Sequence, residues 1–168
     1  PLAVVGVLHS GCASTSSIVA PKSNKSTPAV INDRAIIGQM TAEATKLMDS
    51  DSVVEMKTLI KKLKEEPKAK LRLPKISLAT VQEAQKAVAV IGGVYKCNMC
   101  PNWHVAPASG FFIAEDLVVT NYHVVENPER SGLAVRVFDG RLFMVEDVVA
   151  ASERYDLAVL RLPKTGVK

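Results

Sequence analysis

The chain has 168 residues, of which 48% are apolar and 23% charged, as is typical of a globular protein. Only 5% are aromatic, which argues against a base-stacking platform for nucleic acid. The net charge of +4 is unevenly placed: residues 1–100 hold 14 Lys and Arg against 8 Asp and Glu, whereas residues 101–168 hold 7 against 9. The basic excess lies in the first half, so we expect no nucleic-acid partner for the rest.

Residues 1–17 look like the truncated end of a secretory signal, because a short apolar run is followed by small residues. Ser10-Gly11-Cys12 resembles the end of a bacterial lipobox, which makes Cys12 a candidate for lipidation and a membrane tether. His9 departs from that pattern, and the alternative is a buried first strand with an inert thiol. The expected location is the cell envelope, either periplasmic or secreted, with Cys12 as a possible anchor.

A linker is predicted over residues 18–40 and a basic helical leader over residues 41–79. In the leader, Thr41 is expected to cap a helix that runs to Met48, and Ser52 with Glu55 forms a capping box for a second helix. Residues 57–75 hold eight basic side chains. They can form a patch for anionic lipid or cell-wall polymer, or a solvated helix face; we favour the solvated face, because no aromatic residues lie among the lysines.

Residues 80–168 are predicted to form a mostly β domain. Thr80 and Glu83 make a capping box for a short helix. Gly92-Gly93 indicates a bulge or bend in the strand that follows, and Asp139-Gly140 is typical of a two-residue hairpin. Six strands are expected, enough to close a small antiparallel barrel. They are placed at 87–95, 108–114, 117–121, 133–138, 141–151 and 157–162.

Cys97, Cys100 and His104 form a separate cluster of reactive residue types. The spacing can supply three zinc ligands, whereas a structural zinc site usually has four. In an exported protein a Cys97–Cys100 disulfide is the alternative, and free or redox-active thiols are a third. Zinc, disulfide and thiol all stay open from sequence.

His123 follows the strand that ends in Thr120-Asn121, and Asp156 precedes the last strand, 33 positions later (156 minus 123). With Ser109-Gly110-Phe111, these stretches resemble the trypsin-like serine proteases, most closely the bacterial Deg (HtrA-like) branch, over residues 86–163. The resemblance implies a fold that is the first half of a double β-barrel. It also implies that His123 is the general base, that Asp156 fixes its tautomer, that the substrates are proteins or peptides, and that catalysis needs no cofactor.

No Gly-x-Ser-Gly segment follows Asp156, so the resemblance assigns no nucleophile within this sequence. We expect the serine in a second, C-terminal barrel beyond residue 168, and no peptidase activity from these residues alone. Two other functions are open. One is a catalytically silent protease-like binding module, and the other is a small zinc or thiol protein centred on Cys97, Cys100 and His104.

Overall fold

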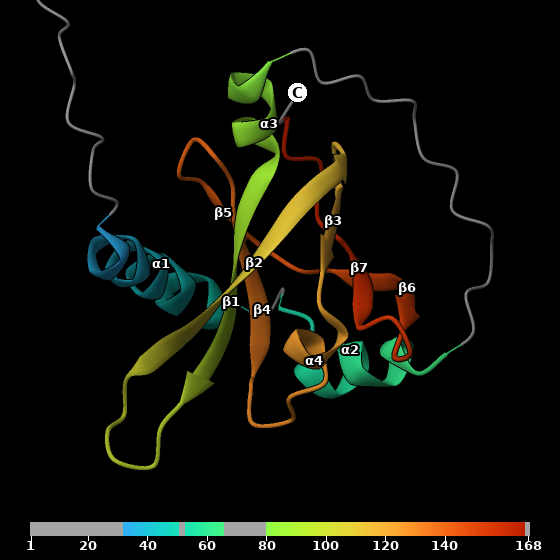
Figure 1. Cartoon of the computed structure of the whole chain (residues 1–168). Coiled ribbons are helices and arrows are strands. Elements are labelled where there is room, and N and C mark those ends of the chain that lie inside the picture. The colour runs from blue at the N-terminus through green and yellow to red at the C-terminus, as the bar shows by residue number, and fades with distance from the viewer. Residues whose placement is uncertain (1–31, 51–52, 66–79, 167–168) are drawn as a thin grey trace, which may run out of the picture. The chain divides into compact units, whose positions relative to one another are not determined.

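The computed structural model describes residues 32–50, 53–65 and 80–166, in which three helices precede the strands and a fourth lies among them (Figure 1). The helices are α1 (Asp33–Met48), α2 (Met56–Leu63), α3 (Val81–Ala87) and the single-turn α4 (Tyr122–Val125). The strands are β1 (Val88–Lys96), β2 (Trp103–Ala114), β3 (Leu117–Thr120), β4 (Gly132–Arg136), β5 (Leu142–Met144), β6 (Asp147–Ser152) and β7 (Leu157–Arg161). The predicted mostly β fold with preceding helices is confirmed.

The strands form one antiparallel sheet that curls back on itself. Their order is β5-β4-β1-β2-β3-β7-β6, which places β5 and β6 at opposite edges. Only Val145 and Glu146 separate these two strands in the chain, a link that spans about 10 Å at most. The backbone N–H of Val145 donates to the Leu133 carbonyl, and that of Glu146 donates to the Arg161 carbonyl, both at 2.9 Å. The two edges of the sheet must therefore meet, which gives the barrel-like curl.

Alternation along the strands produces two apolar layers. One face of each strand points into the barrel, where the largest fully buried side chains of the sheet include Ile91, Leu133, Val135, Val118 and Leu160. The other face of β1, β2 and β4 is covered by α1, whose Met40 and Ala44 are fully buried with Val94, Val105 and Ala134. Helix α1 is thus packed onto the barrel.

The first helix is longer than expected, because it begins at Asp33 and not at Thr41. Asn32 caps it by accepting a hydrogen bond from the Ala35 N–H at 3.0 Å. The Thr41 hydroxyl donates to the Ile37 carbonyl at 2.8 Å, as is usual inside a helix. The prediction of a cap at Thr41 is wrong, because its side chain bonds backward along the helix. Among the described residues, no helix is both long enough and apolar enough to cross a membrane.

One of the two predicted capping boxes forms. At α3 the Thr80 side chain accepts from the Glu83 N–H, and the Glu83 carboxylate accepts from the Thr80 N–H. At α2 the residue in the N-cap position is Glu55, which makes no side-chain capping bond, so Glu55 does not close the predicted box. Ser52 lies outside the described residues.

Seven strands form where six were expected, the second begins at Trp103 and not at residue 108, and further strand predictions are corrected as follows. The stretch 141–151, expected to be one strand, contains β5 and β6, because the link through Val145 passes from one sheet edge to the other. The hairpin after β4 has a three-residue loop, since the Val137 N–H donates to the Arg141 carbonyl, and Gly140 has the left-handed φ of +95° that such a loop requires. The pairing of β1 with β2 runs unbroken through Gly92-Gly93, so no bulge forms there.

Candidate active site

The segment that carries His123 is a single helical turn placed at the end of β3. Asn121 is its N-cap and has an extended backbone, so the chain changes from strand to helix at that residue. Tyr122, Val124 and Val125 are buried in the barrel core. Because three of the four residues of α4 are buried, His123 is the one left facing outward, and its side chain is 69% exposed.

Asp156 stands just before β7 in a left-handed backbone conformation. Its φ is +49°, and among the described residues it is the only non-glycine residue with positive φ. Its backbone N–H donates to the Glu153 carbonyl at 3.0 Å, which closes a tight turn. Left-handed conformations cost free energy in residues that have a Cβ, and aspartate tolerates them better than most. The residue type at position 156 therefore suits the turn as well as the site.

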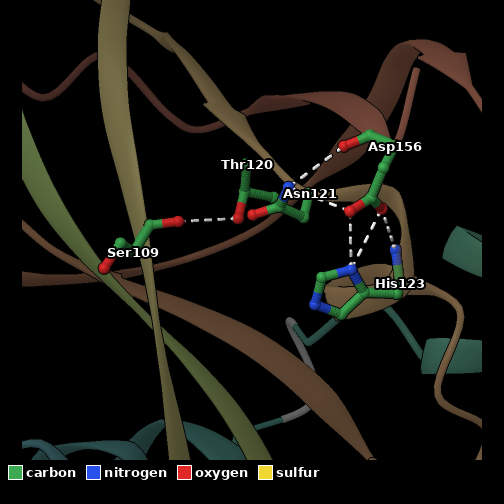
Figure 2. Close-up of polar contacts among 5 residues, drawn as sticks. All are labelled: Ser109, Thr120, Asn121, His123 and Asp156. Carbon is green, nitrogen blue, oxygen red and sulfur yellow. Dashed lines mark hydrogen bonds and ion pairs between the residues drawn. The ribbon is translucent and has the colours of Figure 1, made fainter.

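Figure 2 shows the Asp156 carboxylate facing both the ring and the backbone of His123. Nδ1 of His123 lies 2.8 Å from Oδ2 and 3.0 Å from Oδ1 of Asp156. The backbone N–H of His123 donates to Oδ1 at 3.1 Å. The contact that the sequence-based assignment requires is therefore present, while the catalytic roles of the two residues stay predictions.

The charge of the carboxylate determines which ring nitrogen carries the proton. The pKa of Asp156 lies below its ordinary value, chiefly because the His123 backbone N–H donates to the carboxylate; desolvation opposes this, and the His123 ring and Asn121 add to it. An ionised carboxylate can only accept hydrogen bonds. The neutral ring must then carry its hydrogen on Nδ1 and keep the lone pair on Nε2. This arrangement suits a general base that acts through Nε2.

Two neighbours of His123 complete the site, and the sequence analysis gave them no role. The Asn121 side chain donates to the Asp156 carbonyl at 3.2 Å and to Oδ2 at 3.0 Å. The buried Thr120 hydroxyl donates to the Ser109 carbonyl at 2.9 Å and so ties the end of β3 to β2 (Figure 2). The two polar residues lie three and two positions before His123, which is a usable signal, but their partners become visible only in three dimensions.

Arg130 and α2 hold the α4 turn in place. The Arg130 guanidinium donates to the Val124 carbonyl at 2.6 Å, where the turn leaves carbonyl groups without helical partners. A Cβ at Gly93 would collide with that guanidinium, so the second glycine of β1 makes room for it. On another side α2 packs beside α4, and its Leu59 and Leu63 belong to the same apolar core (Figure 1). His123 is therefore positioned by contacts with several elements distant in sequence.

A second cluster lies at the loop end of the β1–β2 hairpin, where the side chains of Cys97, Cys100 and His104 come together. The two Sγ atoms are 3.2 Å apart, and Sγ of Cys100 is 3.0 Å from Nε2 of His104. Both cysteines are free thiols, and the hydrogen bond with Cys100 is the main reason that the pKa of Cys97 falls to about 7. The three candidate ligand atoms lie within 4.8 Å of one another, close enough to hold a metal ion.

The remaining points concern Cys12 and the second ring nitrogen of His123. Cys12 lies outside the described residues. Among the described residues, no side-chain hydroxyl forms a hydrogen bond with Nε2 of His123. The ring nitrogen that would receive a proton therefore faces outward and is open.

The comparison with known families concerns the segment that contains His123 and Asp156. Residues 108–168 match the model of the trypsin-like peptidase domain, and this stretch contains β2 from Ala108 onward, His123 and Asp156. A search of curated proteins gave no match. The family match does not single out the Deg branch. Residues 108–168 are thus similar to the trypsin-like peptidase domain, in agreement with the family resemblance inferred from the sequence.

Proposed function

We propose that this chain is the part of an exported trypsin-like serine endopeptidase that carries the general base and its orienting acid. The observation that carries the proposal is the contact of Nδ1 of His123 with the Asp156 carboxylate, inside a stretch that matches the peptidase family. In this proposal the nucleophilic serine and the oxyanion hole belong to a second barrel that this sequence does not include.

The proposed reaction assigns a proton to each step. A serine hydroxyl attacks the scissile carbonyl of a protein or peptide substrate, and its proton passes to Nε2 of His123. The Asp156 carboxylate accepts from the Nδ1–H and stabilises the imidazolium. The imidazolium then gives its proton to the leaving amine, and a water molecule repeats the sequence to release the acyl group. These steps use no cofactor.

An apolar row that is exposed on β1 and β2 supports a second barrel as the missing partner. Val88 of β1 pairs with Phe111, Phe111 with Val119, and Val119 with Val159, so one row crosses four strands. Phe111 is 51% and Val88 55% exposed. Leu157, which directly follows Asp156, is also exposed. Apolar surface of this kind is normally covered by another protein surface, which supports a second barrel packed on this face.

Export is the part of the proposal that rests on sequence alone. The apolar run before Cys12 and the small residues after it support passage through a membrane followed by lipidation. A chain anchored in this way would act in the cell envelope. Mass spectrometry of the protein from its native membrane fraction tests this step, because an unmodified Cys12 would contradict it.

The experiment for the catalytic proposal is to continue the coding sequence past Lys168 and treat the longer protein with a fluorophosphonate probe. We expect the longer protein to be labelled at a serine, the His123→Ala variant of it to lose labelling, and the 168-residue chain to stay unlabelled. Labelling of the 168-residue chain would contradict the proposal. So would a continued chain that neither labels nor cleaves peptides, which would support the silent binding module.

A further inference from the structure

The hairpin between β1 and β2 brings together three groups that the proposed peptidase chemistry does not use. Lys96 pairs with Trp103 and Tyr95 with His104, so His104 lies level with the end of β1. Cys97 and Cys100 lie in the connecting loop and are half-buried, as is His104. Ser109, which contacts Thr120 in the candidate active site, is five residues farther along β2, or about 16 Å at 3.3 Å per residue. The cluster is therefore separate from the His123 site.

The distances distinguish two chemical states of the sulfurs. A disulfide would place the two Sγ atoms about 2.05 Å apart, and here they are 3.2 Å apart. Tetrahedral zinc, with Zn–S bonds of about 2.3 Å and Zn–N bonds of about 2.0–2.1 Å, separates its ligand atoms by about 3.5–3.8 Å. The Sγ–Sγ separation of 3.2 Å and the Cys100 Sγ to His104 Nε2 separation of 3.0 Å are therefore about half an ångström shorter than in a zinc site, and all three ligand atoms lie within 4.8 Å of one another.

The imidazole of His104 favours a metal over a disulfide. Nε2 of His104 lies 3.0 Å from Sγ of Cys100, so the imidazole places a third donor atom beside the two sulfurs. The ring of His104 also lies against Tyr95, with a centroid separation of 5.4 Å, which restricts its orientation. Thiolate and imidazole together are the donors that zinc prefers, whereas magnesium and calcium prefer oxygen ligands.

We propose that Cys97, Cys100 and His104 bind one zinc ion, which closes the β1–β2 hairpin loop. The described residues supply three ligands, and a water molecule completes the tetrahedron. The ion ties the loop of residues 97–102 to the start of β2 and takes no part in proton transfer at His123. This inference does not depend on the proposed peptidase function.

The test measures metal content in the full 168-residue chain. A Cys12→Ser background removes the third thiol, and the protein is purified under reducing conditions without chelator. We expect one zinc per chain by elemental mass spectrometry, and thiolate-to-metal charge-transfer absorption after replacement by cobalt. Cys97→Ser, Cys100→Ser and His104→Ala should each weaken zinc binding at least about tenfold. Met99→Ser is the matched control, because Met99 lies in the same loop and is 94% exposed, and it should keep the zinc.

Three results would overturn the proposal. The first is a wild-type chain without zinc that does not take it up when zinc is added. The second is a disulfide in the chain after mild reduction and reoxidation in the presence of zinc. It would show as a chain mass two hydrogens below that of the reduced chain, together with the loss of reactive thiols. The third is unchanged zinc content in the Cys97→Ser and His104→Ala variants. If a variant does not fold, the wild-type chain still decides, because added zinc should raise its Tm and a chelator should lower it.

Discussion

The two polar clusters of this chain differ in how the fold assembles them. Cys97, Cys100 and His104 lie within eight residues of one another, and a single hairpin brings them together. His123 and Asp156 are 33 residues apart and meet only when β3 pairs with β7 and the turn before β7 adopts its left-handed residue. The first cluster should therefore survive local changes elsewhere in the barrel, whereas the second should respond to changes in packing far from it.

The largest expected effect on activity comes from removing the His123 ring. In the protein continued past Lys168, His123→Ala should lower kcat for peptide hydrolysis by about 10⁴- to 10⁶-fold, because the serine loses its proton acceptor. Steady-state kinetics on a peptide substrate measure this. His104→Ala is the matched control: it removes the other described imidazole and should leave kcat within a fewfold of wild type. Equal losses in the two variants would remove the distinction between the clusters.

The next largest effect on activity is expected from substitution of Asp156. Asp156→Asn keeps a side chain that tolerates the left-handed backbone but removes the charge that holds the hydrogen on Nδ1, so kcat should fall about 10⁴-fold while the Tm changes little. Asp156→Ala should lose activity and also lower the Tm, because alanine lacks this tolerance. Paired kinetics and thermal melts separate the two effects. A fully active Asp156→Asn variant would contradict the role of the carboxylate.

A packing change under α4 tests the dependence on distant residues. Leu59 of α2 is fully buried in the core that includes α4, so Leu59→Ala should lower the free energy of unfolding by about 2–5 kcal/mol. Urea denaturation measures this on the 168-residue chain. Lys57→Ala on the same helix is the control, since that side chain is 81% exposed and the effect should stay within about 0.5 kcal/mol. A loss below about 1 kcal/mol for Leu59→Ala would mean that α2 does not support the site.

A smaller effect is expected at the bond between β3 and β2. Thr120→Val keeps the shape of the buried side chain but leaves the Ser109 carbonyl without its donor, which should cost about 1–3 kcal/mol. Thr120→Ser keeps the hydroxyl and should recover most of the bond energy. Unfolding curves of the two variants test this. Equal stability of Thr120→Val and wild type would show that water replaces the hydroxyl.

The smallest effect concerns acid pH. Because the pKa of Asp156 is lowered in the folded state, its ionised form stabilises the fold above its unfolded pKa of about 3.9, and this contribution is lost as the pH falls through the lower folded pKa. The stability difference between wild type and Asp156→Asn should therefore shrink as the pH falls from about 4 toward 2. Urea midpoints over this range measure it. A difference that grows as the pH falls would contradict the sign of the shift.

Local patterns in the sequence predicted the parts of the fold that local chemistry determines. The Thr80 capping box, β3 and β7 follow from caps, alternation and turns, and all three are present. The His123–Asp156 contact could be expected only through resemblance to a known family, because 33 residues of intervening chain give no local signal. Features set by tertiary contacts were not predictable. Residues 145–146 link the two edges of the sheet and so divide the stretch expected to be one strand. The glycine at position 93 leaves room for the guanidinium of Arg130 and does not mark a bulge.

The protonation of the His123 ring tests the central claim most directly, and the 168-residue chain is sufficient for it. With ¹⁵N-labelled histidine, NMR distinguishes the two neutral tautomers, and the His123→Ala variant assigns the signals. We predict that neutral His123 carries its hydrogen on Nδ1, that Nε2 is unprotonated, and that Asp156→Asn weakens this preference. A neutral ring with the hydrogen on Nε2 would contradict the account, because that nitrogen could not accept a proton from a serine.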